Sequence, residues 1–447
     1  MKLKPFIALC LALASSGAGA QQEIHFWHAM GGARGVALQA IMQRFNASQA
    51  DVRVVAEHKG SYEDTLIAAL AAQASGGGPR LVQVYEVGTA HMMAVRSAYR
   101  PAWQVMAEAG TPLDAKAFLP AVASYFSDNG GKLLALPFNL STPILFYNKD
   151  AFRKAKLDPD QAPKTWYEMP KAMGELAEAG YQCVYTTTWP AWVQIENMSN
   201  WHKQEFATRD NGLLGPDASL VFNTHLMVRH VSMLSSWARA GYFTYSGRAY
   251  EGERRFARGE CAMVTASSSS AADLFAVAKF ELGYAQLPYY DDIRGAPHHT
   301  LIGGAGLWTM AGKKPAEYRA MARFLGWLAR PEVQAEWHQR TGYVPLMRAS
   351  YELTAQTGFY KSHPGHEIAI RQLLLNQPTQ ESRGIRLGEF PAIRAILEEE
   401  LEAVWDGKVP PKLALDRAAE RGNQLLRRFE AAHRDTARRA PAPRGKK

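Results

Sequence analysis

Cysteine is scarce in this 447-residue sequence, which contains three. Cys10 falls in the leading apolar stretch, so Cys183 and Cys261 remain for the rest of the chain. Neither has histidine or further cysteine nearby at the spacing of a zinc site, which argues against a structural metal. An oxidising compartment would permit one disulfide, but the spacing in the sequence does not show whether the two residues meet.

Long apolar runs are also absent. The leading run, residues 5–15, is too short for a membrane-crossing helix, which needs roughly 20 residues. It follows Lys2 and Lys4 and leads into small residues that end in Ala18 and Ala20. Because small residues at these two places mark a signal-peptidase site, residues 1–20 are predicted to be a cleaved signal peptide that exports the chain.

The folded part of the chain lacks a strong excess of basic charge. The formal net charge is +9, but the two leading lysines contribute +2 and the segment after Ala432 contributes +5. The remaining charge is too small for a nucleic-acid-binding surface, so no nucleic acid is expected as a partner. Residues 434–447 have no apolar periodicity and are predicted to be a disordered basic tail, with contact to anionic lipids as the alternative.

Catalytic and metal-binding motifs are missing as well. The sequence has no H-E-x-x-H and no G-x-S-x-G, and no histidine lies near Ser267 in the sequence. His25 and His28 stand at a strand end where they would not share a face, and the pair 298–299 is predicted to be a solvated loop. We therefore predict that the protein is not an enzyme and that it holds neither a metal nor another cofactor.

The order of the elements predicts an α/β protein. Apolar strand-like stretches at 23–27, 52–55 and 81–85 alternate with helical periodicity at 35–45 and with a helix capped by Ser61. This order is typical of a βαβαβ unit in an open sheet. Later strand-like stretches also end in small or polar residues that precede helices. Ligands bind at such strand ends, where helix N-termini favour anions.

Several runs of residues, in their order and spacing, carry a resemblance to a known family. The runs are Phe26–His28, Lys59–Glu63, Gln83–Thr89, Pro137–Pro143, Thr265–Ser268, Ile302–Ala305, Trp337–Tyr343 and Glu420–Phe429. The sequence resembles the extracellular solute-binding proteins of the maltodextrin-binding kind, and among them those that serve periplasmic importers of sn-glycerol 3-phosphate. The resemblance covers about residues 23–430.

The resemblance implies a two-lobed α/β periplasmic-binding-protein fold of type II, with the ligand cleft between the lobes. Lobe I is expected to comprise residues 21–139 and 286–340, and lobe II residues 140–285 and 341–433. The expected chain crossings lie near 139–143, 285–288 and 342–345. The implied partners are the permease subunits of an ABC importer with a cytoplasmic ATPase, and the protein is expected to be a periplasmic monomer.

The resemblance also implies which residues contact the ligand: Tyr62, Glu86, Ser141, Ser267, Gly304, Tyr343 and Arg394, with Trp189 or Trp192 as an aromatic wall. On this basis Arg394 and the Gly304 backbone would bind a phosphate. Glu86 would repel a phosphate, so it is expected at the other end, facing glycerol hydroxyls or a choline. Taken alone, Arg394 has a simpler interpretation as the helical salt-bridge partner of Glu398.

The predicted ligand is sn-glycerol 3-phosphate, together with glycerophosphodiesters such as glycerophosphocholine. The sequence does not decide between them. The first alternative is an oligosaccharide or polyol binder on the same scaffold, which would use aromatic platforms and acidic residues without a phosphate-directed arginine. The second is a glycerophosphodiester hydrolase, against which the missing catalytic motifs argue.

Overall fold

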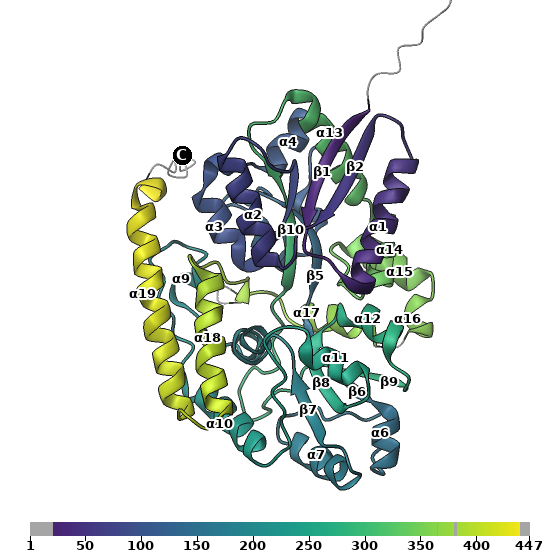
Figure 1. The fold of residues 1–447 in the computed structure, drawn as a ribbon, viewed down its shortest axis with the longest axis vertical. Helices are drawn as coiled ribbons and strands as arrows, with labels where there is room; N and C mark the ends of the chain where they lie inside the picture. The colour runs from purple at the N-terminus through teal and green to yellow at the C-terminus, as the bar shows by residue number, and fades with distance from the viewer. Residues whose placement is uncertain (1–20, 364, 380–381, 439–447) are drawn as a thin grey trace, which may run out of the picture.

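The computed structural model describes residues 21–363, 365–379 and 382–438, which form two α/β lobes (Figure 1). The predicted signal peptide and the tail beyond Arg438 lie outside the described residues. Within the described chain, no helix is long and apolar enough to cross a membrane, and no three acidic, histidine or cysteine side chains gather as a metal site.

The first sheet confirms the predicted βαβαβ unit at the N-terminal end. Strands β1 (Gln22–His28), β2 (Val52–His58) and β3 (Leu81–Tyr85) are parallel, with β1 between β2 and β3. Helices α1 (Gly32–Ala47) and α2 (Tyr62–Ala74) connect them. Ser61 caps α2 as predicted, because its hydroxyl accepts the Asp64 N–H while the Asp64 carboxylate accepts the Ser61 N–H.

Three further strands complete this sheet. Strand β10 (Gly303–Met310) is antiparallel to β3 and also pairs with β4 (Tyr99–Arg100) and β5 (Leu136–Ser141). The pairing of β10 with β5 places Gly303 beside Ser141 and Gly304 beside Leu140. The other elements around this lobe are η1 (Glu86–Gly88), α3 (Thr89–Ala94), η2 (Arg96–Ala98), α4 (Ala102–Glu108), η3 (Ala115–Ala117), α5 (Pro120–Phe126), α13 (Pro315–Leu328) and α14 (Pro331–Thr341).

The second sheet has the order β7 (Cys183–Thr187), β8 (Cys261–Ser267), β6 (Pro143–Asn148) and β9 (Leu282–Ala285). Strand β6 is buried on both faces: Ile144 and Phe146 belong to the core shared with the first lobe, whereas Leu145 and Tyr147 face the core of the second lobe. Cys183 and Cys261 stand opposite each other on β7 and β8 and form a disulfide. The structure thus answers the question that the sequence left open.

Helices surround the second sheet. They are α6 (Lys149–Lys154), α7 (Met169–Glu178), the π-helix η4 (Ala191–Glu196), α8 (Asn197–Trp201), α9 (Thr208–Asn211), α10 (His225–Arg239), α11 (Glu251–Ala257), α12 (Ser270–Val277), α18 (Phe390–Trp405) and α19 (Pro411–Arg438). Helices α15 (Arg348–Gln356), α16 (Phe359–Ser362) and α17 (Ile368–Leu373) lie at the junction (Figure 1). Helix α19 continues to Arg438, past the expected start of the tail at residue 434.

The chain crosses between the lobes close to two of the three expected places. Thr142 alone separates β5 of the first sheet from β6 of the second. The segment 342–347 lies at the junction, where the Val344 N–H donates to Leu140 O and Leu346 O accepts the Leu119 N–H.

The expected return to lobe I at residue 286 is wrong, because residues 287–301 pack on the second lobe. The Trp201 indole donates to Leu287 O, the Tyr290 N–H donates to His202, and the Leu301 N–H donates to Asn197. The chain therefore returns to the first lobe only at Ile302, directly before β10.

The same packing corrects the prediction for the histidine pair 298–299. Both side chains are buried rather than solvated. The ring nitrogen Nε2 of His299 lies 2.7 Å from the Ser382 hydroxyl. Burial lowers the pKa of His299 to about 4, so its imidazole is neutral at neutral pH.

Candidate functional site

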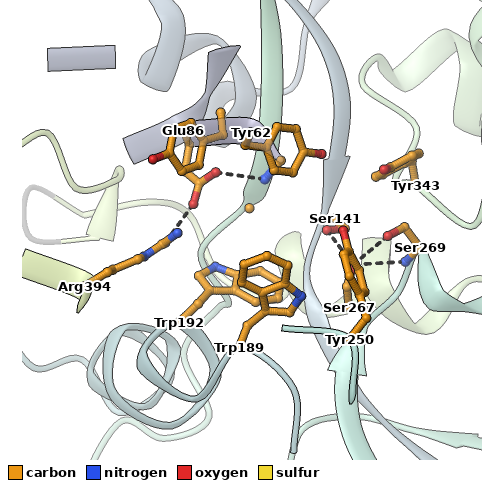
Figure 2. A pocket seen from close by; sticks show the side chains of 13 residues that line it. Tyr62, Glu86, Ser141, Trp189, Trp192, Tyr250, Ser267, Ser269, Tyr343 and Arg394 are labelled. Atoms are coloured by element: carbon orange, nitrogen blue, oxygen red, sulfur yellow. Dashed lines mark hydrogen bonds and ion pairs between the residues drawn. The ribbon is translucent and has the colours of Figure 1, made fainter. Parts of the chain in front are cut away.

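A cavity lies between the two lobes, where both sheets end. Its walls contain every residue that the sequence marked as a ligand contact, including both candidate tryptophans. The residues that line it are Tyr62, Tyr85, Glu86, Ser141, Trp189, Trp192, Tyr250, Ser267, Ser269, Gly303, Gly304, Tyr343 and Arg394. Figure 2 shows Glu86 and Arg394 on one side, the serines and Tyr250 on the other, and the two tryptophans between them.

The first end of the cavity is an ion-pair network around Arg394, which lies in the second turn of α18. Its guanidinium donates to both carboxylate oxygens of Glu196, at 2.6 and 2.7 Å. It also donates to Glu86 Oε1 at 2.7 Å, and this contact joins the two lobes. Burial alone would lower the pKa of Arg394, but the two carboxylates outweigh it and raise the pKa well above its usual value. Arg394 is therefore a permanent cation shared by two carboxylates.

This network corrects the polarity expected from the sequence. Glu86 and Arg394 were expected at opposite ends of the ligand, yet they are in contact, and the Gly304 N–H also donates to Glu86 Oε2 at 3.0 Å. The carboxylate of Glu86 thus takes the place that was assigned to a phosphate. The simpler interpretation, a pair between Arg394 and Glu398, is also wrong, because the guanidinium binds the two glutamates 86 and 196.

Glu398 forms a hydrogen bond to the start of the π-helix beside the cavity. Its Oε1 accepts the N–H of Ala191, the first residue of η4, at 2.8 Å. The π-helix carries Trp192 and Glu196 into the site, and such wide turns recur at functional sites. The other carboxylate oxygen of Glu398, Oε2, is buried and has no partner among the described residues. Burial raises the pKa of the Glu398 carboxyl to about 8.

Replacing Glu398 by glutamine is expected to remove part of the pH dependence of stability. The folded-state pKa of about 8 exceeds the ordinary value of 4.5. The stabilisation that the protonated carboxyl contributes is therefore fully present below about pH 4.5 and is lost as the pH rises from there through 8. Glutamine keeps the acceptor for Ala191 and cannot ionise. We expect E398Q to be more stable than the parent by about 2–4 kcal/mol at pH 8.5 and little changed at pH 5.

Urea denaturation at pH 5, 7 and 8.5 measures this difference, with the exposed Glu420→Gln as the control. If the free energy of unfolding changed with pH by the same amount in E398Q and in the parent, the assignment of a protonated Glu398 would be contradicted.

The second end of the cavity is a group of serine hydroxyls. Ser141 ends β5 and Ser267 ends β8, and the Ser268 N–H donates to Thr142 O, which brings the two strand ends together. Ser267 Oγ lies 2.8 Å from the hydroxyls of both Ser141 and Ser269. Helix α12 begins at Ser270, so its positive N-terminal end lies beside these hydroxyls. The three hydroxyls hydrogen-bond to one another, and each O–H can rotate to donate to an anion instead.

A chain of amide groups fixes the direction of the Tyr62 hydrogen bond. The Ala29 N–H donates to the side-chain oxygen of Gln83, whose amide nitrogen donates to Asn139 Oδ1. Asn139 Nδ2 must then donate to the Tyr62 hydroxyl oxygen, at 2.9 Å. Since that oxygen already accepts a hydrogen bond from the amide, the Tyr62 hydrogen is free to be donated into the cavity.

Aromatic rings form the floor of the cavity, and both candidate tryptophans belong to it. Trp189 has a left-handed backbone (φ +48°), an unusual conformation for a bulky residue, and its ring meets Tyr250 edge to face. The Trp192 indole N–H has no partner among the described residues. A side chain at Gly303 would lie 2.7 Å from the Trp192 ring, so the glycine makes room for this tryptophan.

Sequence reasoning missed one partner, Glu196, and four lining residues, which are Tyr85, Tyr250, Ser269 and Gly303. Ser269 belongs to the serine run at 267–270, and Gly303 adjoins Gly304, so strand-end position could have indicated both. Tyr250 precedes a short helix far from every quoted run, and nothing local distinguishes it. Glu196 neutralises Arg394 from 198 residues away, which spacing in the sequence cannot reveal.

Comparison with known proteins identifies the family. The model of the bacterial extracellular solute-binding proteins matches residues 40–367. The chain belongs to this family. It is 48% identical over 432 residues to the sn-glycerol-3-phosphate-binding periplasmic protein UgpB of Yersinia pseudotuberculosis, which covers 96% of this chain and 98% of that one. The protein of the same name from Pectobacterium atrosepticum is also 48% identical, over 95% of this chain and 96% of the relative.

Solved structures confirm the predicted two-lobed fold of this solute-binding protein. UgpB from Mycobacterium tuberculosis in complex with glycerophosphocholine has a TM-score of 0.77 at 21% identity and covers 91% of this chain and 99% of its own. Maltose-bound MalE3 of T. maritima has a TM-score of 0.74 at 14% identity and covers 90% and 99%. The relatives are binding proteins, which confirms the prediction that the chain is not an enzyme.

Proposed function

We propose that the protein binds sn-glycerol 3-phosphate in the interlobe cavity and delivers it to an ABC importer. The observation that carries the proposal is the chemical difference between the two ends of the cavity. The network of Glu86, Glu196 and Arg394 holds two carboxylates against one guanidinium, which disfavours a phosphate but suits hydroxyl groups. The serine end offers hydroxyl donors and a helix N-terminus, which suit a phosphate.

The ligand is therefore placed with its phosphate on Ser141, Ser267 and Ser269 and its glycerol hydroxyls on the network of Glu86 and Arg394. Tyr62 donates to the phosphate, and the hydroxyl of Tyr343 has no partner among the described residues and faces the same end (Figure 2). The tryptophan floor contacts the carbon skeleton. The name shared by the relatives at 48% identity supports the same ligand.

The same proposal includes the compartment in which the protein works and the membrane proteins with which it works. We propose that residues 1–20 direct export to the periplasm and are then removed. We also propose that the mature protein acts as a monomer. Closure of the lobes on the ligand presents one face of each lobe to the permease subunits, which a cytoplasmic ATPase drives. Because a ligand shifts this equilibrium only by its preference for the closed form, the contacts that join both lobes determine the affinity.

Isothermal titration calorimetry of the mature protein tests the ligand. We expect micromolar or tighter binding of sn-glycerol 3-phosphate, which is about −8 kcal/mol, and no heat with maltose. Ser267→Ala should weaken binding at least 10-fold, whereas the exposed Ser236→Ala should leave it unchanged. Binding of maltose or a polyol without binding of the phosphate ester would contradict the proposal and favour a sugar binder on this scaffold.

Asn139→Asp is expected to weaken binding of sn-glycerol 3-phosphate by about 10- to 100-fold, the value of a hydrogen bond to a charged group. The new carboxylate would accept the Tyr62 hydrogen that the asparagine leaves free for the phosphate. The matched variant Tyr62→Phe removes the same donor, so the double variant should bind no more weakly than either single variant. Additive losses, measured in the same calorimeter, would contradict this role of Asn139.

A further inference from the structure

A carboxylate of the second lobe caps a helix of the first lobe. The N-cap residue of α1, Gly31, makes no side-chain cap bond, and the first turn of the helix holds no acidic residue. The N–H of Ala33 in that turn instead donates to Asp273 Oδ1 of α12, at 2.8 Å. A carboxylate in this position satisfies a free donor and meets the positive end of the helix dipole. Helix α1 is therefore capped from the other lobe, by a residue 240 positions along the chain.

Gly32 leaves room for this contact between the lobes. Its φ is +58°, a left-handed conformation that glycine adopts without steric cost. A Cβ added at this position would lie 2.7 Å from Asp273 Oδ1. The missing side chain at position 32 thus lets the carboxylate of the second lobe reach the Ala33 N–H.

The Arg34 side chain of α1 reaches across to the second lobe as well. Its guanidinium pairs with Asp273 at 2.6 Å, lies 3.8 Å from Glu253 and stacks over the Tyr250 ring at 4.6 Å. It also donates to Ser269 Oγ at 3.3 Å. All four partners belong to the second lobe, and Arg34 is buried among them. Opening of the lobes would therefore break these contacts and return the guanidinium to water.

The contacts of Arg34 and Asp273 lie outside the ligand cavity, because neither residue lines it. They differ in this respect from Glu86 and Arg394, which join the lobes and also line the cavity. The gap beside Arg34 and Asp273 is lined from both lobes, by the start of α1 and by residues of α11 and α12. The closed form thus has a connection between the lobes that a ligand in the cavity does not have to touch.

We propose that Asp273 and Arg34 form a latch that holds the ligand-free protein partly closed. The cap on the Ala33 N–H and the ion pair form only when the lobes meet, so they raise the closed fraction. Because the closed form encloses the ligand, the apparent affinity rises with that fraction. The latch therefore strengthens binding of every enclosed ligand by the same factor. This inference goes beyond the proposed function, because it does not depend on which ligand the cavity takes.

Asp273→Ala and Asp273→Asn test the latch in two steps. Asparagine keeps an acceptor for the Ala33 N–H and removes the charge, whereas alanine removes both. Each variant leaves the Arg34 guanidinium of the closed form without its nearest carboxylate, which penalises that form. In calorimetry, we expect D273A to weaken binding of sn-glycerol 3-phosphate and of glycerophosphocholine at least 10-fold and by the same factor. D273N should weaken both by a smaller common factor.

Small-angle X-ray scattering of the ligand-free proteins measures closure itself. We expect a larger radius of gyration for D273A than for the parent, with D273N between them. The matched control is Asp51→Asn, because Asp51 pairs with Arg323 within the first lobe, and it should equal the parent in both measurements. A parental radius of gyration in D273A would overturn the latch. Losses of affinity that differ between the two ligands would also overturn it, because they would indicate a ligand contact instead of closure.

The two measurements separate this inference from the proposed function. A parent protein that binds neither compound contradicts the proposed function, whereas the scattering comparison uses ligand-free protein and still decides on the latch. Urea denaturation of D273A with the cooperative transition and the slope of the parent excludes partial unfolding as the cause of a larger radius.

Discussion

Replacing Arg394 by alanine is expected to lower the free energy of unfolding by about 3–5 kcal/mol and to weaken ligand binding at least 100-fold. The structure gives two reasons. The change leaves Glu86 and Glu196, both buried, without their cation. It also removes the contact between Arg394 and Glu86 that joins the lobes, so the closed form loses stability even before the ligand is considered.

A matched variant separates the two effects. Arg394→Met combined with Glu196→Gln removes one buried charge of each sign and fills a similar volume, so it should recover much of the stability. The ligand affinity should stay low in this double variant, because the contact across the cleft is still absent. Urea denaturation and calorimetry measure the two quantities, and an R394A variant with parental stability and affinity would contradict the importance of the network.

Gly304→Ala is the second change for which we expect a large effect, a loss of about 3–5 kcal/mol in the free energy of unfolding. Gly304 has a φ of +111°, and a Cβ there would lie 2.0 Å from the carbonyl oxygen of Asn139 on the paired strand. The backbone oxygen cannot rotate away, so β5 and β10 must separate. The separation would also withdraw the Gly304 N–H from Glu86 and disturb the site.

Gly312→Ala is the control for the cost of the backbone conformation alone. Gly312 also has a positive φ, of +72°, but an added Cβ there would meet nothing within 4 Å. We expect it to cost only about 1 kcal/mol, the strain of a left-handed backbone. Equal thermal and urea stability of the two glycine variants would show that β10 can move away from β5 without cost.

Local patterns in the sequence predicted the first lobe well. The βαβαβ unit and the Ser61 cap depend on periodicity and on neighbours within four residues, which the sequence displays directly. The residues that the matching runs marked also line one cavity between the lobes. The pairing within the cavity was not predicted, because Glu86 and Arg394 are 308 residues apart and meet only when the lobes come together.

The other differences between prediction and structure arise where the chain passes from one lobe to the other. The segment 287–301 contains no regular element, so its docking on the second lobe depends on single contacts such as the Trp201 indole with Leu287 O. The burial of His299 follows from that docking. Neither the boundary at residue 286 nor the environment of the histidine pair could be derived from local composition.

Each place where the chain crosses between the lobes also contributes to the cavity wall. Ser141 is the last residue before the first crossing, Gly303 and Gly304 are the first after the return, and Tyr343 lies in the junction segment. We therefore expect substitutions at these four positions to change the shape of the cavity and the connection between the lobes together.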